Sequence, residues 1–283
     1  MKFKSIQLSI AVLAGACLFI AVGVMTLYSV YSSERSQTYV QERSEQLLEG
    51  LVKDRLLSIA NGERSRIQRR LEYPIAVAQQ VANLNAMLGE IQPDGMPSLM
   101  MGREEMTRVL RMTLAENPDL WDVYVGWEPN SLDEMDEFYR GIETDGYNGS
   151  GRYMPVWFRG EGGELELEPL GDMESTTLLD SGVRTGEYYL CTRETLKPCV
   201  IDPASYEMGG KQVLLSSFTV PIIVDGEFKG AAGADLAMDF LQNMLTESDS
   251  ELYDGQGEQA LVSDKGRLVA YTGTDARPGD RAD

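Results

Sequence analysis

Residues 212–240, QVLLSSFTVPIIVDGEFKGAAGADLAMDF, predict a β-hairpin around which the rest of the chain is arranged. The apolar run Val220–Val224 leads into Asp225-Gly226. An Asp-Gly pair between apolar runs is a strong signal for a tight hairpin turn. The returning strand carries small residues at 230–234, which let another backbone, a side chain or a ligand come close. Asp235 ends this strand, where a carboxylate either caps the next helix or holds a ligand.

The composition is acidic and lacks histidine. The chain has 45 Asp and Glu against 25 Lys and Arg, a formal net charge of −20 and no His. Such a surface repels nucleic acid and attracts cations, although it also serves simple solubility. Without histidine, the chain cannot build a Ser-His-Asp or Cys-His nucleophile or a His-ligated zinc site. A hydrolase based on two carboxylates stays open, but no pair of acids has a spacing that the sequence fixes. We therefore expect no enzyme, no catalytic residues, no metal and no cofactor.

Residues 1–33 predict a short cytoplasmic N-terminus and one membrane-spanning helix. The segment Ile6–Val30 is mostly apolar and uncharged, and it is long enough to cross a bilayer. Lys2 and Lys4 precede it, which favours a cytoplasmic N-terminus. We expect a single pass through the inner membrane, with the chain after about residue 34 in the periplasm. A cleaved signal peptide is the alternative, although its apolar core is normally shorter.

Residues 34–90 predict a long helix that continues out of the membrane. Apolar residues recur at nearly helical spacing between positions 47 and 71, and the other faces carry Glu, Arg and Gln. Such a stalk usually pairs with a second copy, so we expect a homodimer. The alternative is that the stripe packs on the chain's own globular part. A kink or break is expected near Pro74, and a second helix is expected over 103–116.

The region after residue 120 predicts several short strands. A long polar connection, 128–150, has the length that is typical of a binding lid. Strands after one or two helices favour an α+β fold, with an antiparallel sheet and helices on one face. Residues 258–272 predict a further strand, turn and strand. The strands expected before the hairpin are Trp121–Trp127, Gly151–Phe158, Leu165–Pro169, Gly186–Leu190 and Pro198–Pro203.

The runs VGWEPNSLD, GSGRYMPVWFR, GEYYL, IDP and VPIIVDGEFKGAAGADL together resemble the double-Cache ectodomains of bacterial methyl-accepting chemotaxis receptors. Within that family they look most like receptors for polyamines and related amines. The resemblance implies a PAS-like Cache module over 91–247, distal to the membrane. It also implies the start of a second, membrane-proximal module over 248–283, so we expect the chain to be a fragment. The implied function is ligand sensing for chemotaxis across the membrane.

The resemblance also implies ligand-binding residues. Asp235 matches the acid that holds the ligand's ammonium group. Receptors for amino acids have an Arg-Pro-Trp run that supplies an Arg for the ligand carboxylate, whereas this chain has Met154-Pro155-Val156-Trp157. A purely cationic ligand needs carboxylates and aromatic faces. Amine receptors tend to place an aromatic residue and an acid two positions apart after an Asp-Pro pair. Here those positions are Ala204 and Tyr206, so Asp202 or Glu207 could supply the second charge.

We expect a polyamine or another amine as the ligand, and less readily an amino acid. The tryptophans among the candidate residues could equally be core residues, and the acids could equally cap a helix or shape a turn. The candidates are Asp235, Trp127, Tyr147, Trp157, Tyr189, Asp202 and Tyr206.

Cys191 and Cys199 flank a short polar loop. In an oxidising compartment we expect a disulfide between them. Two alternatives stay open for the function: a sensor ectodomain of a histidine kinase or of a cyclic-dinucleotide enzyme, and a membrane-anchored interaction protein without a ligand.

Overall fold

The structure is a computed structural model that describes residues 6–96, 98–144, 146–160, 162–251, 256–263 and 266–282. The chain divides into two compact units, Met1–Arg64 and Ser65–Asp283. Lys2 and Lys4, on which the predicted orientation of the N-terminus rests, lie outside the described residues, as does part of the predicted turn in 258–272.

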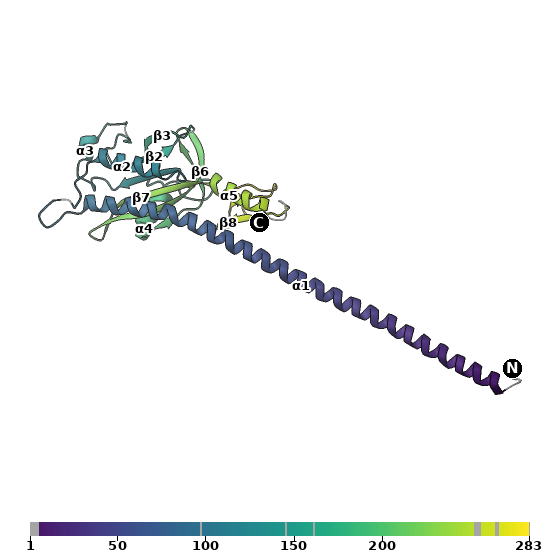
Figure 1. The fold of residues 1–283 in the computed structure, drawn as a ribbon. Helices are drawn as coiled ribbons and strands as arrows, with labels where there is room; N and C mark the ends of the chain where they lie inside the picture. The colour runs from purple at the N-terminus through teal and green to yellow at the C-terminus, as the bar shows by residue number, and fades with distance from the viewer. Residues whose placement is uncertain are drawn as a thin grey trace. The chain divides into compact units, whose positions relative to one another are not determined.

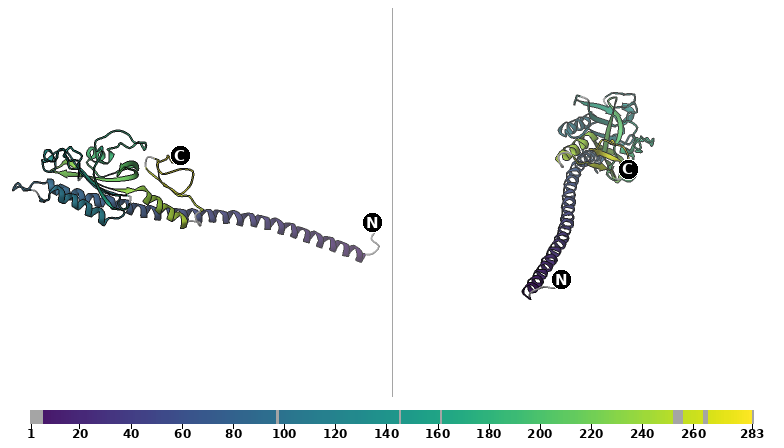
Figure 2. Two further views of the ribbon diagram at one scale, coloured as in Figure 1. Left: turned by 90° about the horizontal axis from the view of Figure 1, so that it is seen from above. Right: turned by 90° about the vertical axis from the view of Figure 1, so that its right-hand side faces the viewer.

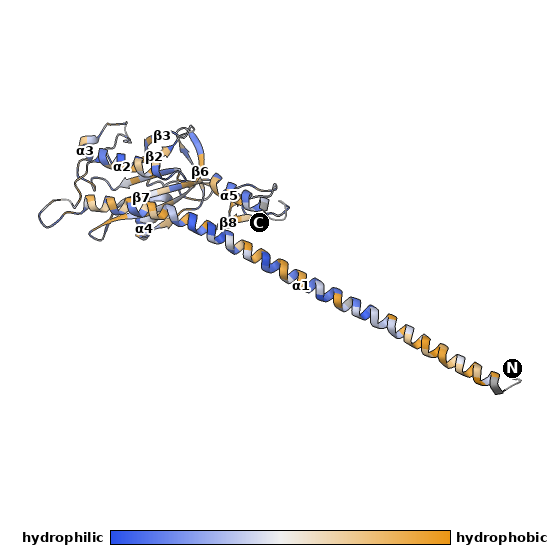
Figure 3. Cartoon of the chain, in the orientation of Figure 1, coloured by the Kyte–Doolittle hydropathy of each residue, from blue (hydrophilic) through white to orange (hydrophobic). Residues whose placement is uncertain are grey.

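Helix α1 spans Ile6–Gly89 and supplies the described part of the first unit. Its apolar beginning is the one helical stretch, among the residues described, that is long and apolar enough to cross a membrane (Figure 3). Of the kink or break predicted near Pro74, the break is wrong, because the helix continues through this residue, and the kink stays a prediction. Proline costs a helix interior about 3 kcal/mol. Burial of Val77, Ala78 and Val81 in the core of the second unit offsets that cost.

The second unit is built on an antiparallel sheet of seven strands (Figure 1). The strand order is β3-β2-β1-β7-β6-β4, and β5 also pairs with β6. A long apolar helix followed by this sheet and its helices confirms the predicted α+β fold class. The strands are β1 Asp122–Trp127, β2 Pro155–Arg159, β3 Leu165–Pro169, β4 Cys199–Val200, β5 Ala204–Met208, β6 Lys211–Val224 and β7 Glu227–Ala237.

The remaining helices are α2 Arg103–Glu116, α3 Asp136–Tyr139, α4 Glu187–Thr195 and α5 Met238–Glu251, and a separate hairpin is formed by β8 Ala260–Val262 and β9 Leu268–Tyr271. The predicted strand over 186–190 is wrong, because these residues begin α4. A short apolar run does not distinguish a buried strand from a buried helix. Glu187 in the first turn and Arg193 in the last turn complement the helix dipole and favour the helix.

The two faces of the sheet have different partners (Figure 2). Side chains alternate between the faces along each strand. Val123, Val125 and Trp127 of β1 belong to the large core that α2 and residues 65–89 of α1 complete. Tyr124 belongs to a second cluster on the opposite face, together with residues of α4. We call this opposite face the α4 face.

The connection from β7 to α5 has no loop. Strand β7 ends at Ala237, and α5 begins at Met238. Helix α5 is held in the second unit by its own buried residues, Leu241, Met244 and Leu245. Its Gln242 also bonds to the backbone of β9 at Tyr271.

Candidate ligand-binding site

A cavity of about 300 Å³ lies on the α4 face of the sheet. The central strands β1, β6 and β7 form its base through Asp122, Tyr124, Leu215, Ser217 and Asp235. Tyr188 of α4, residues 205–208 of β5 and residues 168–172 form its walls. A cavity of this size suits a small organic molecule rather than a peptide.

Two buried carboxylates share the base of the cavity. Asp122 of β1 lies directly opposite Asp235 of β7 in the antiparallel ladder, so both side chains project from the same face. They are 2% and 5% exposed, respectively. Ser217 Oγ donates a hydrogen bond of 2.7 Å to Asp235 Oδ2. The Oδ1 atoms of both carboxylates have no hydrogen-bond partner among the described residues.

Burial and mutual repulsion change how these acids ionise. Burial raises the pKa of Asp235 to about 7, against the hydrogen bond from Ser217, which lowers it. Burial raises the pKa of Asp122 well above its usual range, and the neighbouring charge of Asp235 adds to the effect. Two adjacent buried carboxylates cannot both ionise without a cation, so the empty pair retains a proton near neutral pH.

Three tyrosines line the same cavity. Tyr188 meets Tyr124 edge to face at 5.5 Å between ring centroids, and it meets Tyr206 in the same manner at 6.2 Å. Burial raises the pKa of each phenol, and the nearby carboxylates raise those of Tyr124 and Tyr206 further. The phenols therefore stay neutral, and their ring faces are suited to contact a cation.

The lining is strongly one-sided in charge. Its acids are Asp122, Glu168, Asp172, Glu207 and Asp235, and none of the described lining residues is Lys or Arg. The arrangement favours a cation and provides no fixed positive group for a ligand carboxylate.

Two of the candidate residues from the sequence come together here, because Asp235 and Tyr206 both line the cavity. Trp127 and Trp157 instead belong to the core on the other face of the sheet. Trp127 donates to Asn85 Oδ1, and Trp157 donates to the carbonyl of Thr107.

The other three candidates lie outside the cavity lining. Tyr189 is the neighbour of Tyr188 on α4, and its hydroxyl donates to Glu128 Oε1 at 2.6 Å. Tyr147 stacks on Tyr139 with ring centroids 5.1 Å apart. Asp202 is half-buried in the connection between β4 and β5.

Sequence reasoning missed Asp122, Tyr124 and Tyr188, all of which line the cavity. The available signal was the acid at the start of the apolar run WDVYVGW, since a buried strand rarely carries a charged residue without a reason. Tyr188 was missed because residues 186–190 were predicted as a strand, whereas residues 187–195 form α4.

The wall of the cavity is tied by a disulfide between Cys191 of α4 and Cys199 of β4. Cys199, Val183, Ile201 and Ala204 form a small buried cluster, against which Tyr206 packs. The disulfide thus links the helix that carries Tyr188 to the segment that leads into β5.

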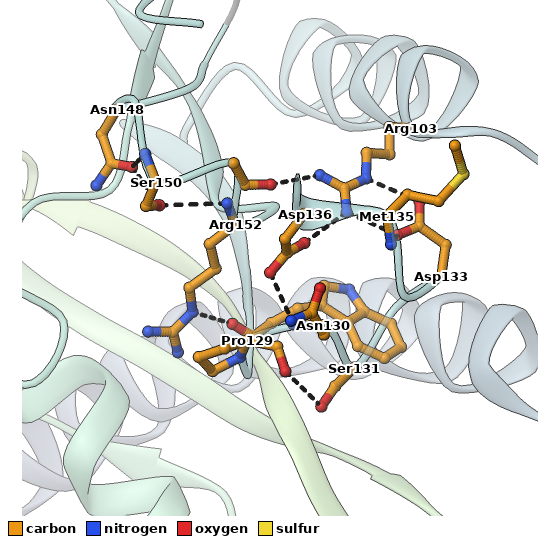
Figure 4. Close-up of polar contacts among 12 residues, drawn as sticks. Arg103, Pro129, Asn130, Ser131, Asp133, Met135, Asp136, Asn148, Ser150 and Arg152 are labelled. Atoms are coloured by element: carbon orange, nitrogen blue, oxygen red, sulfur yellow. Dashed lines mark hydrogen bonds and ion pairs between the residues drawn. The ribbon is translucent and has the colours of Figure 1, made fainter. Parts of the chain in front are cut away.

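A polar cluster outside the cavity orders the long connection 128–150 (Figure 4). Arg103, which is 3% exposed, donates to both carboxylate oxygens of Asp133, to Asp136 and to the carbonyl of Gly151. Burial lowers the pKa of its guanidinium, but the bonds to the two aspartates outweigh burial and raise it. Asp136 Oδ2 also accepts from the backbone of Asn130 at 2.7 Å. All of these groups are satisfied within the chain, so the cluster is structural.

Comparison with known proteins finds similarity to part of a bacterial receptor. No family model matches this chain. The methyl-accepting chemotaxis protein TlpQ of Pseudomonas aeruginosa is 32% identical over 278 residues, which are 96% of this chain and 38% of that protein. The chain therefore spans about two fifths of the length of this relative.

Solved sensory domains share the fold. The solved structure of a methyl-accepting chemotaxis protein designated X gives a TM-score of 0.65 at 18% identity, covering 83% of this chain and 79% of that chain. The extracellular domain of a putative histidine kinase, mmHK1S-Z2, gives 0.57 at 25% identity, covering 72% and 66%. The periplasmic sensory domain of the Campylobacter jejuni chemoreceptor Tlp1 gives 0.54 at 14% identity, covering 74% and 68%.

The predicted resemblance to chemoreceptor ectodomains is thus confirmed in homology and in fold, while the amine-binding group stays a prediction. The chain is homologous over nearly its whole length to part of a methyl-accepting chemotaxis protein and has the fold of a bacterial extracytoplasmic sensory domain.

Proposed function

We propose that this chain is the extracytoplasmic ligand-sensing part of a transmembrane chemoreceptor and that it binds a small cationic amine. The observation that carries the proposal is the cavity with Asp122 and Asp235 at its base, five acids in its lining and no Lys or Arg among the described lining residues. A buried carboxylate pair without a cation is unfavourable, and a bound ammonium group would supply the missing charge.

The lining favours an amine over an α-amino acid. An amino acid carries a carboxylate that needs a cation or several N–H donors. At Met154–Trp157, where the resemblance to amino-acid receptors would require an Arg, Met154 is buried in an apolar cluster. Val156 lines the cavity at this point.

The apolar beginning of α1 is proposed to cross the inner membrane, which would leave the second unit in the periplasm. An oxidising compartment is consistent with the disulfide between Cys191 and Cys199. The homology to a chemotaxis receptor supports an output through chemotaxis rather than through a kinase. A preference of the ligand for one of two packings of the second unit suffices for a signal.

The test is calorimetric titration of the full chain in lipid nanodiscs with putrescine, spermidine, histamine and a set of amino acids. Moderate to high salt is needed because a protein of net charge −20 attracts polyamines weakly at its surface. We expect saturable binding of an amine that Asp235→Asn abolishes. Asp180→Asn is the matched control, because Asp180 is an exposed acid that does not line the cavity. Binding of amino acids alone would reject the amine proposal.

A further inference from the structure

Four buried polar atoms in the cavity are left without hydrogen bonds. They are Asp122 Oδ1, Asp235 Oδ1 and the hydroxyls of Tyr124 and Tyr206, and each lacks a partner among the described residues. Buried polar atoms in folded proteins are almost always paired, and exceptions at a cavity mark places where a ligand or water completes the bonding. All four atoms belong to residues that line one cavity, so one bound molecule can reach them.

The geometry of the strands places the two carboxylates at the same end of the cavity. Asp122 and Asp235 are direct partners in the β1–β7 ladder, and partners in such a ladder have Cβ atoms about 5 Å apart. Two carboxylates this close meet the same chemical group of a ligand rather than its two ends. Ser217 occupies only the Oδ2 atom of Asp235, and the Oδ1 atom of each acid is a buried acceptor without a partner among the described residues.

Building on the proposed function, we propose that Asp122 and Asp235 hold one cationic head group between them and that this head must carry at least two N–H donors. Primary and secondary ammonium groups and guanidinium groups meet this requirement. A quaternary ammonium has no N–H, so it would contact the rings of Tyr124, Tyr188 and Tyr206 but leave both carboxylate oxygens unpaired. Asp122 is thus a specificity-determining residue, whereas the aromatic walls alone would accept any cation.

The experiment compares two cations that differ in N–H donors and little else. Tert-butylammonium and tetramethylammonium have the same composition, the same charge and nearly the same tetrahedral shape, but only the first has N–H groups. Each is titrated by calorimetry into the full chain in nanodiscs. We expect tert-butylammonium to bind roughly tenfold or more tightly than tetramethylammonium, as the loss of charged hydrogen bonds predicts. Asp122→Asn should remove most of this preference, because it weakens tert-butylammonium, which loses a charged hydrogen bond, much more than tetramethylammonium.

Asp180→Asn is the control, because it removes an exposed carboxylate that does not line the cavity and should keep the preference. Thermal unfolding of each variant shows whether it is folded. Equal affinities for the two cations, both lost in Asp235→Asn, would overturn the head-group inference while the proposed amine function stands. Binding of neither cation would overturn it too, and the titrations with putrescine and spermidine then decide separately whether the proposed function fails.

Discussion

Gly233 of β7 lies directly opposite Tyr124 of β1, and the ring of Tyr124 occupies the space that a side chain at position 233 would need. The small residue at this position therefore leaves space for the ring, which lines the cavity. The run of small residues in β7 therefore has two effects: it leaves space for this ring, and it allows the strands to pair closely.

Gly233→Ala should weaken amine binding. The added methyl group overlaps the end of the Tyr124 ring, and we expect the ring to move into the cavity that it lines. We expect an affinity loss of roughly tenfold or more, equivalent to about 1.4 kcal/mol, measured by calorimetry. The matched control is Gly171→Ala, since Gly171 also lines the cavity and a methyl group there meets nothing. Equal losses in both variants would contradict this account of the ring.

The stability of the empty protein should fall as the pH rises from about 4 to about 7. The pKa of Asp235 is raised to about 7 in the folded state, so the folded state favours the protonated form. A group of this kind contributes most below its unfolded pKa of about 4, and the contribution is lost as the pH rises through the folded pKa. Asp235→Asn removes this loss. As the pH rises through this range, the melting temperature of the Asp235→Asn variant should therefore increase relative to that of the natural protein.

Amine affinity should rise as the pH rises from about 4 to about 7, because a cation binds the ionised form of the Asp122 and Asp235 pair. Titration calorimetry at several pH values measures this, with Glu207→Gln as a control for an exposed acid of the lining. The pair of Asp122 and Asp235 is described as retaining a proton near neutral pH. This would be contradicted if the difference in melting temperature between Asp235→Asn and the natural protein did not change with pH.

Replacing both cysteines of the disulfide with serine should destabilise the second unit. Cys191 and Cys199 are separated by 8 positions. Closing a loop of this length in the unfolded chain is worth about 2.5 kcal/mol on the chain-entropy description. Chemical denaturation of the double variant measures the loss. Amine affinity should fall as well, because the disulfide fixes α4 with Tyr188 beside β4. Cys17→Ser, a change at the exposed free cysteine, should leave both quantities unchanged.

Arg103→Lys should lower the free energy of unfolding by about 2 kcal/mol or more. Lysine keeps the charge but has three N–H donors on one atom, so it cannot reproduce the four hydrogen bonds that three guanidinium nitrogens donate to Asp133, Asp136 and the carbonyl of Gly151. Denaturation experiments give the difference. Arg108→Lys is the control on the same helix, because the pair of Arg108 with Glu104 is exposed and worth little. Since the cluster lies outside the cavity, amine affinity should change far less than stability does.

The stalk segment of α1 should pair with a second copy. Its exposed apolar side chains include Leu47, Leu48 and Leu51, and the i, i+3 and i, i+4 spacings to Leu51 place them on one side of the helix. In a Cys17→Ser background, Leu51→Cys should give a disulfide-linked dimer on mild oxidation in nanodiscs. Glu49→Cys, on another face of the helix, should give much less. Equal cross-linking of both variants would argue against a specific paired face.

The hairpin could be predicted from the sequence because its turn depends on local chemistry. Asp225 and Gly226 both have positive φ, 51° and 80°, as the tight primed turn requires. The antiparallel β6–β7 pair follows from that turn and from the apolar runs beside it. Helix α2 was predicted equally well, because its apolar spacing and the Asn-Pro pair after it are local signals too.

The site could be predicted only in part, because it depends on the pairing of strands far apart in sequence. Alternation along β1 puts Asp122 and Trp127 on opposite faces, but only the register with β7 shows which face carries Asp235. Trp157 of β2 is paired with Val123 of β1, so both side chains lie on the face of the sheet that α1 and α2 cover. Aromatic residues in a strand indicate burial, and they do not indicate which face is hollow.

The direct junction of β7 and α5 connects the base of the cavity rigidly to the start of a helix. Asp235 lies near the end of β7, and the helix starts immediately after Ala237. A backbone without a loop has no joint at which to absorb a small rotation. If a bound cation twisted this strand, α5 would therefore tilt with it. The displacement would be larger at the far end of α5 than at the junction.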